Sequence, residues 1–210
     1  MIKKNLKTMI ITSIVILLPI IVGIILWDKL PDQVATHFDG NGVADGWSPK
    51  EFAVFGLPLF LLVVHWLCVA FTGVDPKKKN ISDKVMVLVM WLCPAVSIVG
   101  NAATYLYEMD NTINTVPMAI IFLGCLFLVV GNYMPKMKQS YVIGIKLPWT
   151  LNSEENWQRT HRVGGYVYML AGLLFIITGF IQQYWLVPVA FVLMAFVPTV
   201  YSLILYKKGI

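Results

Sequence analysis

Charged residues are scarce in this sequence. Asp, Glu, Lys and Arg make up 13% of the 210 residues, whereas hydrophobic residues make up 58%. Soluble domains usually carry about 25% charged residues. The composition therefore excludes an ordinary water-soluble domain and indicates a single membrane domain over residues 1–210.

The residues that enzymes and metal proteins gather into clusters are also few and scattered. The chain has 3 Cys and 3 His, none at a spacing typical of metal ligands. It contains no H-E-x-x-H, G-x-S-x-G or Walker motif. We expect no catalytic residue, no cofactor-binding residue and no metal site, and hence a protein that is not an enzyme.

Long hydrophobic runs are what the sequence does have. Six segments approach the length of about 20 apolar residues that crosses a bilayer core. The chain is therefore predicted to be an all-α integral membrane protein, a bundle of six transmembrane helices. The first segment lacks a cleavage site and is expected to stay in the protein as a signal anchor. The expected spans cover residues 9–27, 52–72, 85–106, 116–133, 165–182 and 185–206.

No Asp, Glu, Lys or Arg lies in the interior of these expected spans. A charge at the bilayer centre costs about 2.5–3.5 kcal/mol on insertion scales, and where one occurs it usually marks ion or proton transport. Its absence argues against an ion-coupled transporter. His65 is the one ionisable residue expected at depth, and both a hydrogen bond to a neighbouring helix and a functional role remain open for it.

The basic residues predict how the chain is oriented. Fourteen of the 16 Lys and Arg residues fall at the two termini and in the second and fourth connecting loops, and the others are Lys29 and Lys50. By the positive-inside rule, both termini are cytoplasmic. The excess of basic charge then reflects topology and contact with anionic lipid. It does not indicate direct binding of nucleic acid.

The first outer loop, residues 28–51, is expected to form a small extracellular β-hairpin. Asn41-Gly42 lies between the short runs "VATHFD" and "VADGW", and Asn-Gly between such runs is a strong hairpin signal. The spacing of Asp39 and Asn41 resembles the start of a calcium-binding loop. However, Val43 occupies the third ligand position and Lys50 the twelfth, where Glu is required, so calcium is not expected.

The outer loops are acidic, with seven Asp and Glu residues beside two Lys. A cationic partner that approaches from outside would be favoured electrostatically. The plain alternative is that these loops are simply solvated. An aromatic residue in the hairpin is expected to anchor it at the membrane surface. The candidate contact residues of this loop are His37, Asp39, Asp45 and Trp47.

Glycines recur every seven residues in two of the expected spans. They are Gly165, Gly172 and Gly179 in the fifth span and Gly124 and Gly131 in the fourth. Seven residues are two helical turns, so each set lies on one helix face, where small residues let helix backbones approach closely. Close helix packing is the expected role, and a substrate groove is the alternative.

The fourth loop, residues 134–164, is polar and is expected in the cytoplasm. Pro148 holds the residues before it in an extended conformation. Asn152 is a plausible helix N-cap, with Glu155 three residues later. The sequence therefore predicts a short amphipathic helix on the inner leaflet that leads into the fifth span. It is expected to act as an interfacial anchor, as a docking platform for a partner or as a gate under the bundle. One face of this helix carries Trp157, His161 and Gly164.

Two stretches of the chain resemble the SdpI family of bacterial membrane proteins. "LPDQVATHFDGNGVADGWSPK" is similar to the amino-terminal module of that family. "GNYMPKMKQSYVIGIKLPWTLNSEENWQRTHRVGG" is similar to its second module and is the more specific of the two. The residues that match the pattern of the second module are Asn132, Gly144, Lys146, Pro148, Trp149, Thr150, Trp157 and Gly164.

The resemblance implies a multi-pass protein of the bacterial plasma membrane that gives immunity against a secreted killing peptide. It also implies a signalling receptor that holds a cytoplasmic repressor at the membrane when toxin is present. The implied partners are therefore the lipid bilayer, a toxin peptide on the outer face and a repressor protein on the inner face. The alternative function is a transporter or channel for small solutes or peptides without ion coupling.

Overall fold

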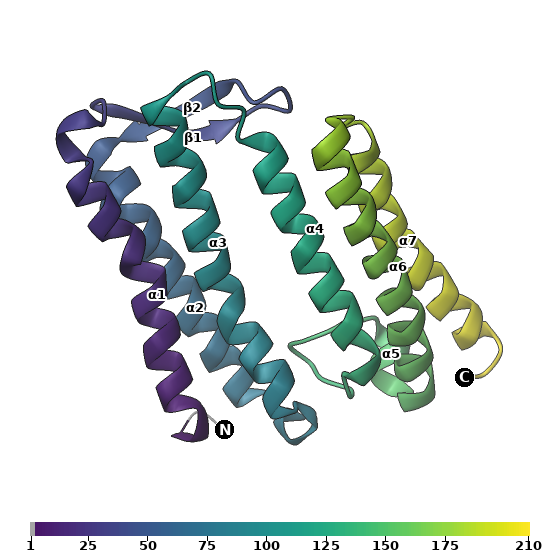
Figure 1. Cartoon of the computed structure of the whole chain (residues 1–210). Coiled ribbons are helices and arrows are strands. Elements are labelled where there is room, and N and C mark those ends of the chain that lie inside the picture. Colours follow the sequence, from purple (N-terminus) through teal and green to yellow (C-terminus); the bar gives the residue numbers. More distant parts are fainter. Residues whose placement is uncertain (1–2) are drawn as a thin grey trace. The chain divides into compact units, whose positions relative to one another are not determined.

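The computed structural model describes residues 3–210, and its described part is mostly helical (Figure 1). Six of its helices are long and apolar enough to cross a membrane, which confirms the predicted number of spans. A single two-stranded sheet accompanies them in the described chain. The helices are α1 (Leu6–Ile25), α2 (Leu57–Val74), α3 (Asp83–Met109), α4 (Val116–Tyr133), α5 (Pro148–Asn152), α6 (Glu154–Ile181) and α7 (Leu186–Lys207), and the strands are β1 (Gln33–Phe38) and β2 (Ala44–Pro49).

The chain divides into two compact units. The first comprises Met1–Ala70 and Val87–Ala119, and the second comprises Phe71–Met86 and Ile120–Ile210. The helices α2, α3 and α4 each contribute residues to both units.

In the first unit, polar side chains connect α1 to its neighbouring helices. Ser97 Oγ donates a hydrogen bond to Ile16 O at 2.8 Å, and the Tyr105 hydroxyl donates to Pro19 O at 3.2 Å. His65 is fully buried, and its Nε2 lies 3.1 Å from Thr12 Oγ1. These contacts satisfy polar groups that lipid cannot hydrogen-bond. Of the two roles left open for His65, a bond to a neighbouring helix is therefore present.

The predicted hairpin forms between α1 and α2, with β1 and β2 antiparallel. Its turn is built by Asp39, whose carboxylate accepts hydrogen bonds from Val43 N at 2.9 Å and Asn41 N at 2.8 Å. These bonds, the one from Val43 foremost, hold the pKa of the Asp39 carboxyl below its usual value. Gly42 has a φ of +83°, a conformation that glycine adopts without strain.

In the second unit, the glycine stripes of α4 and α6 face each other. A Cβ on Gly124 would lie 2.6 Å from Gly172 O, and a Cβ on Gly131 would lie 2.8 Å from Gly165 O. Side chains at these positions would force the two backbones apart. The prediction that the stripes serve close helix packing is confirmed.

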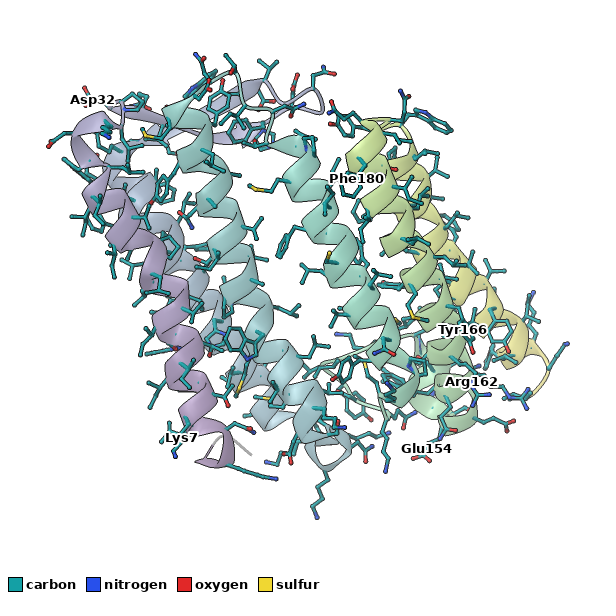
Figure 2. All side chains as sticks on the ribbon, viewed as in Figure 1. Lys7, Asp32, Glu154, Arg162, Tyr166 and Phe180 are labelled. Atoms are coloured by element: carbon teal, nitrogen blue, oxygen red, sulfur yellow. The ribbon has the colours of Figure 1, made fainter. Side chains whose placement is uncertain are left out.

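The helix α6 differs from its predicted form. Residues 154–164 are its first turns rather than a separate surface helix, and α6 runs without a break for 28 residues. Figure 2 shows Glu154 and Arg162 near one end of it and Phe180 near the other. At about 1.5 Å per residue it is about 42 Å long, close to the thickness of a bilayer with its headgroups.

The start of α6 explains this continuity. The predicted N-cap at Asn152 is wrong by one residue, because Asn152 ends α5 and the extended Ser153 caps α6 by accepting a hydrogen bond from Asn156 N at 3.1 Å. The face that was expected to lie on lipid is covered by protein instead: Trp157 and His161 have no exposed surface. Glu155 pairs with Arg159 at 2.6 Å on the exposed side.

The contact between α4 and α6 predicts the effect of a single methyl group. In Gly172→Ala, the new Cβ would lie 2.7 Å from Gly124 O, and such overpacking lowers the free energy of unfolding by about 1–3 kcal/mol. We expect a lower thermal midpoint for the purified protein in detergent. Gly100→Ala is the matched control, because a Cβ there meets no atom within 4 Å. Equal midpoints for the two variants would contradict this packing.

Candidate functional site

The loop between α4 and α6 closes around Gly144. This residue has a φ of +114°, which residues with a side chain rarely adopt. A Cβ there would also lie 2.5 Å from His161 Nε2 and 2.8 Å from the ring of Trp157. Conformation and space therefore both require glycine at this position of the motif.

Trp157 and His161 form the centre of this site. Their rings stack with centroids 4.0 Å apart at an angle of 21°. Trp157 Nε1 donates to Met137 O at 2.8 Å. Ile145 N donates to His161 Nε2 at 2.9 Å, and His161 Nδ1 lies 2.9 Å from Trp157 O. The imidazole must therefore be neutral with its proton on Nδ1, because Nε2 accepts a hydrogen bond. His161 thus holds the loop through the backbone N–H of Ile145.

Thr150 and Gln139 fix the short helix α5 to the loop. Thr150 Oγ1 accepts from Leu147 N at 2.9 Å and lies 3.0 Å from Ile145 O. Gln139 Nε2 donates to Thr150 O at 2.7 Å and to Leu151 O at 2.8 Å. These bonds satisfy carbonyl groups that a helix end leaves without partners. Leu147 is extended, as predicted for the residue before Pro148.

A second network joins α5 and α6 to α7. Trp149 Nε1 donates to Ser202 Oγ at 2.7 Å, and Ser202 Oγ donates to Asn156 Oδ1 at 2.7 Å. Asn156 Nδ2 donates to Ile210 O at 3.1 Å near the end of the chain. Trp149 also stacks on Tyr206, with ring centroids 5.6 Å apart. The network positions the motif residue Trp149 against the carboxyl-terminal helix.

Asp75, which sequence reasoning missed, holds the other end of the loop. It is 1% exposed and accepts hydrogen bonds from Ser140 Oγ at 2.6 Å, Tyr141 N at 3.0 Å, Val142 N at 3.1 Å and Lys77 N at 2.7 Å. Burial favours a higher pKa for the Asp75 carboxyl, but these hydrogen bonds outweigh it and lower the pKa. Asp75 is the only acid in the run "VDPKKKN", and this isolation was the available signal.

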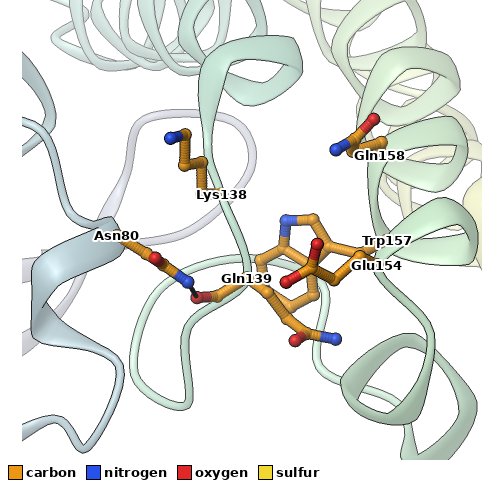
Figure 3. Close-up of a pocket in the computed structure, with 6 residues that line it drawn as sticks. All are labelled: Asn80, Lys138, Gln139, Glu154, Trp157 and Gln158. Atoms are coloured by element: carbon orange, nitrogen blue, oxygen red, sulfur yellow. Dashed lines mark hydrogen bonds between the residues drawn. The ribbon is translucent and has the colours of Figure 1, made fainter.

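A polar hollow of about 220 Å³ opens beside this cluster (Figure 3). Asn80 Nδ2 donates to Gln139 O at 2.8 Å across its floor. Trp157 forms its back wall although it has no exposed surface. The lining thus combines the cation of Lys138 and the carboxylate of Glu154 with several side-chain amides. The lining residues are Asn80, Lys138, Gln139, Glu154, Trp157 and Gln158.

The structure brings some of the predicted residues together and leaves others apart. Gly164 joins the cluster, because a Cβ there would lie 2.9 Å from Ile145 Cδ1. Asn132 is exposed and lies 3.4 Å from Lys136 Nζ, and Lys146 is exposed and donates to Val142 O at 3.2 Å. Neither of these side chains reaches the stacked rings by a hydrogen bond. The residues gathered in the cluster are Gly144, Pro148, Trp149, Thr150, Trp157, His161 and Gly164.

The remaining candidates belong to the hairpin of the first unit. His37 Nδ1 lies 2.5 Å from Asp45 Oδ1, and both side chains are exposed. Trp47 is 57% exposed, as a surface anchor requires. Asp39 serves the turn described above. A role of these residues in contact with a partner stays a prediction.

Comparisons with known proteins match both motifs. Residues 136–202 match the model of the SdpI/YfhL protein family. Over this segment the chain is similar to the SdpI family. Residues 14–62 match a domain of unknown function, DUF1648. The chain is 25% identical to "Immunity protein SdpI" of Bacillus subtilis (strain 168), over 98% of this chain and 97% of that protein. No solved structure gives a significant match.

The two matched segments coincide with the two structural motifs. The SdpI segment contains Gln139, Gly144 and the stacked rings of Trp157 and His161, and it extends to Ser202. The other segment contains most of α1, the hairpin and the start of α2.

Asp75→Asn tests the loop anchor and its pH dependence. Hydrogen bonds to a charged group contribute about 1.5–3 kcal/mol each, so we expect a clearly lower thermal midpoint for the variant at pH 7. Because the pKa of Asp75 is lowered by folding, its contribution is present above the unfolded value near 3.8 and is lost as the pH falls further. The gap between wild type and variant should therefore shrink between about pH 4 and pH 2.

Glu154→Gln is the control for this measurement, since Glu154 is an exposed acid of the same unit. It should leave the midpoint unchanged at every pH. A gap for Asp75→Asn that stays constant down to pH 2 would contradict the proposed role of its charge.

Proposed function

We propose that this protein gives the cell that makes it immunity against a secreted peptide toxin. The observation that carries the proposal is the similarity to an immunity protein along 98% of this chain and 97% of the relative. The matched family segment holds the hydrogen-bonded cluster around Trp157 and His161. A shared function is therefore supported over the whole membrane domain.

The proposed orientation places the hairpin outside and the Trp157–His161 cluster in the cytoplasm. It rests on the positive-inside rule. Within the second unit, exposed basic residues follow the loops and helix ends around the cluster. They are Lys78, Lys79, Lys84, Lys136, Lys138, Lys146, Arg159, Arg162, Lys207 and Lys208.

In this orientation the acidic hairpin meets the toxin first. Hydrogen bonds hold the pKa of Asp39 and of Asp110 below the usual value, so both stay anionic in mildly acidic surroundings. The bonds to Asp110 come from the Thr112 side chain and from Thr112 N. A cationic peptide would be concentrated at this end before it inserts into the membrane.

The finer proposal is that a cytoplasmic repressor docks beside the cluster. Trp157 and His161 cannot contact a partner directly, because they have no exposed surface. A partner would instead use the exposed rim of the polar hollow, where Lys138, Glu154 and Gln158 are accessible. The buried rings would then serve as the rigid support of a docking platform.

Survival of a sensitive bacterium tests the immunity proposal. Cells that express the protein should survive the killing fraction secreted by the producer strain, and cells with an empty vector should die. Trp157→Ala should remove protection because it empties a fully buried site, which costs about 3–5 kcal/mol. The measurement is the surviving fraction at matched amounts of membrane-inserted protein.

The rim variants Lys138→Glu and Gln158→Ala separate signalling from immunity. They should preserve survival and weaken recruitment of the repressor to the membrane, which a fluorescent repressor fusion would report. Death of cells that contain correctly inserted wild-type protein would contradict immunity. Solute efflux from proteoliposomes made with the wild-type protein would favour the transporter alternative.

A further inference from the structure

A groove of about 300 Å³ lies beneath the hairpin in the first unit. Residues 36–38 of β1 form one wall. Gly100, Ala103 and Thr104 of α3 and Thr115 and Ala119 around the start of α4 form the rest. We call this space the hairpin groove. It is separate from the polar hollow beside Trp157, which belongs to the second unit.

The strand that walls the groove is irregular at that place. The register of β1 and β2 shifts between Ala35 and His37 and again between His37 and Phe38. Such bulges bend a strand and redirect its side chains, and they are frequent beside functional sites. Here Phe38 packs edge-on against Tyr107 with ring centroids 4.9 Å apart, and Ala35 N donates to Glu108 Oε1 at 2.6 Å. The distorted strand is thus held firmly onto the end of α3.

The floor of the groove is made of small residues and has open space above it. A Cβ on Gly100 would meet no atom within 4 Å. This differs from the glycines of the α4–α6 contact, where backbone fills the space. The small residues on this floor therefore leave room that protein atoms do not occupy.

Two threonines add polar atoms to the lining of the groove. Thr104 is 6% exposed and Thr115 is 4% exposed. A hydroxyl can both donate and accept a hydrogen bond. A polar group of a bound molecule would find hydrogen-bond partners there.

Acidic residues adjoin the lining of the groove. Asp45 Oδ1 lies 2.5 Å from His37 Nδ1, and Asp39 follows Phe38 in the chain and is kept anionic by its hydrogen bonds. Lys50, one of the two basic residues of this end, lies 3.7 Å from Asp32 and 5.3 Å above the ring of Trp27. The net field at the mouth of the groove therefore favours a cation.

We propose that the hairpin groove binds one apolar side chain of a cationic peptide. The groove is at the small end of the roughly 300–1,000 Å³ of ligand pockets, so it suits a single aromatic or aliphatic side chain better than a whole helix. The backbone or a polar atom of the peptide hydrogen-bonds Thr104 and Thr115, and its cationic residues face the acidic residues that adjoin the groove. On the basis of the proposed immunity function, this peptide is the toxin.

The depth of the groove agrees with a partner that enters from the membrane surface. Gly100 lies nine residues before the end of α3 at Met109, which is roughly 13 Å along the helix axis. The groove thus reaches from the hairpin into the candidate membrane span Asp83–Met109. Cationic peptides with large apolar side chains partition into this interfacial zone.

Gly100→Leu is the decisive variant, because a Cβ at this position meets no atom within 4 Å and the rest of the side chain would occupy the groove above its floor. Leu also has a higher helix propensity than Gly, so folding should be retained. Gly100→Ala is the matched control that leaves most of the space open. Ala70→Leu, on an exposed position of α2, controls for added apolar surface.

The binding probe is a short fluorescein-labelled peptide with one Trp between pairs of Lys. Its counterparts carry Ala in place of Trp, or Glu in place of Lys. Fluorescence anisotropy is measured with the full chain in phosphatidylcholine nanodiscs, and empty nanodiscs give the baseline. We expect the Lys–Trp peptide to bind wild type, Gly100→Ala and Ala70→Leu, and to bind Gly100→Leu roughly ten- to a hundredfold more weakly, the worth of one buried apolar side chain.

Equal binding of this peptide to wild type and Gly100→Leu overturns the proposal, and so does the absence of binding to wild type. Survival assays with the same variants keep the two proposals distinct. If wild type and Gly100→Leu protect equally, the groove is not the toxin site although immunity stands. If wild type does not protect, immunity fails, and the peptide measurement still decides whether the groove binds cationic peptides.

Discussion

The stack of Trp157 on His161 is the interaction on which the family motif of this protein depends. Both rings are fully buried. Trp157 Nε1 donates a hydrogen bond to Met137 O, and His161 Nε2 accepts one from Ile145 N. Gly144 passes so close to the rings that no side chain fits there. Removal of either ring would leave backbone polar groups without partners at the end of a membrane helix, where an unsatisfied group is costly. The residues of the motif therefore form one closed loop, in which they position each other.

The two segments that match family models use polar chemistry in opposite ways. In the second unit, nearly every polar group of the loop forms an internal hydrogen bond. Asp75 and Gln139 each bond several partners. In the first unit, the side chains of His37, Asp45 and Trp47 in the hairpin are exposed. A satisfied network stabilises a shape, whereas exposed polar groups are available to a partner. This contrast supports recognition at the hairpin and a structural role for the Trp157–His161 cluster.

Sequence reasoning succeeded where the physics is local. The hairpin followed from Asn41-Gly42 between strand-forming runs, and the α4–α6 contact followed from glycines spaced by two helical turns. It failed where distant segments meet. Asp75 is 65 residues from its partner Ser140, and its importance depends on a contact that no local pattern encodes. The sequence predicts a surface helix for the first turns of α6, because their polar and aromatic faces fit a membrane interface equally well.

The sequence alone determined the number of spans, the hairpin and the resemblance to the SdpI family, because hydrophobic length, turn chemistry and motif spacing are properties of short segments. Only the tertiary structure decided which polar residues are buried with hydrogen-bond partners inside the protein and which are exposed. Trp157 and His37 look alike as candidates in the sequence, yet one is enclosed by protein and the other is exposed. The physical reason is that burial and hydrogen-bond satisfaction depend on what the rest of the chain places around a residue, and this is settled only when the helices pack.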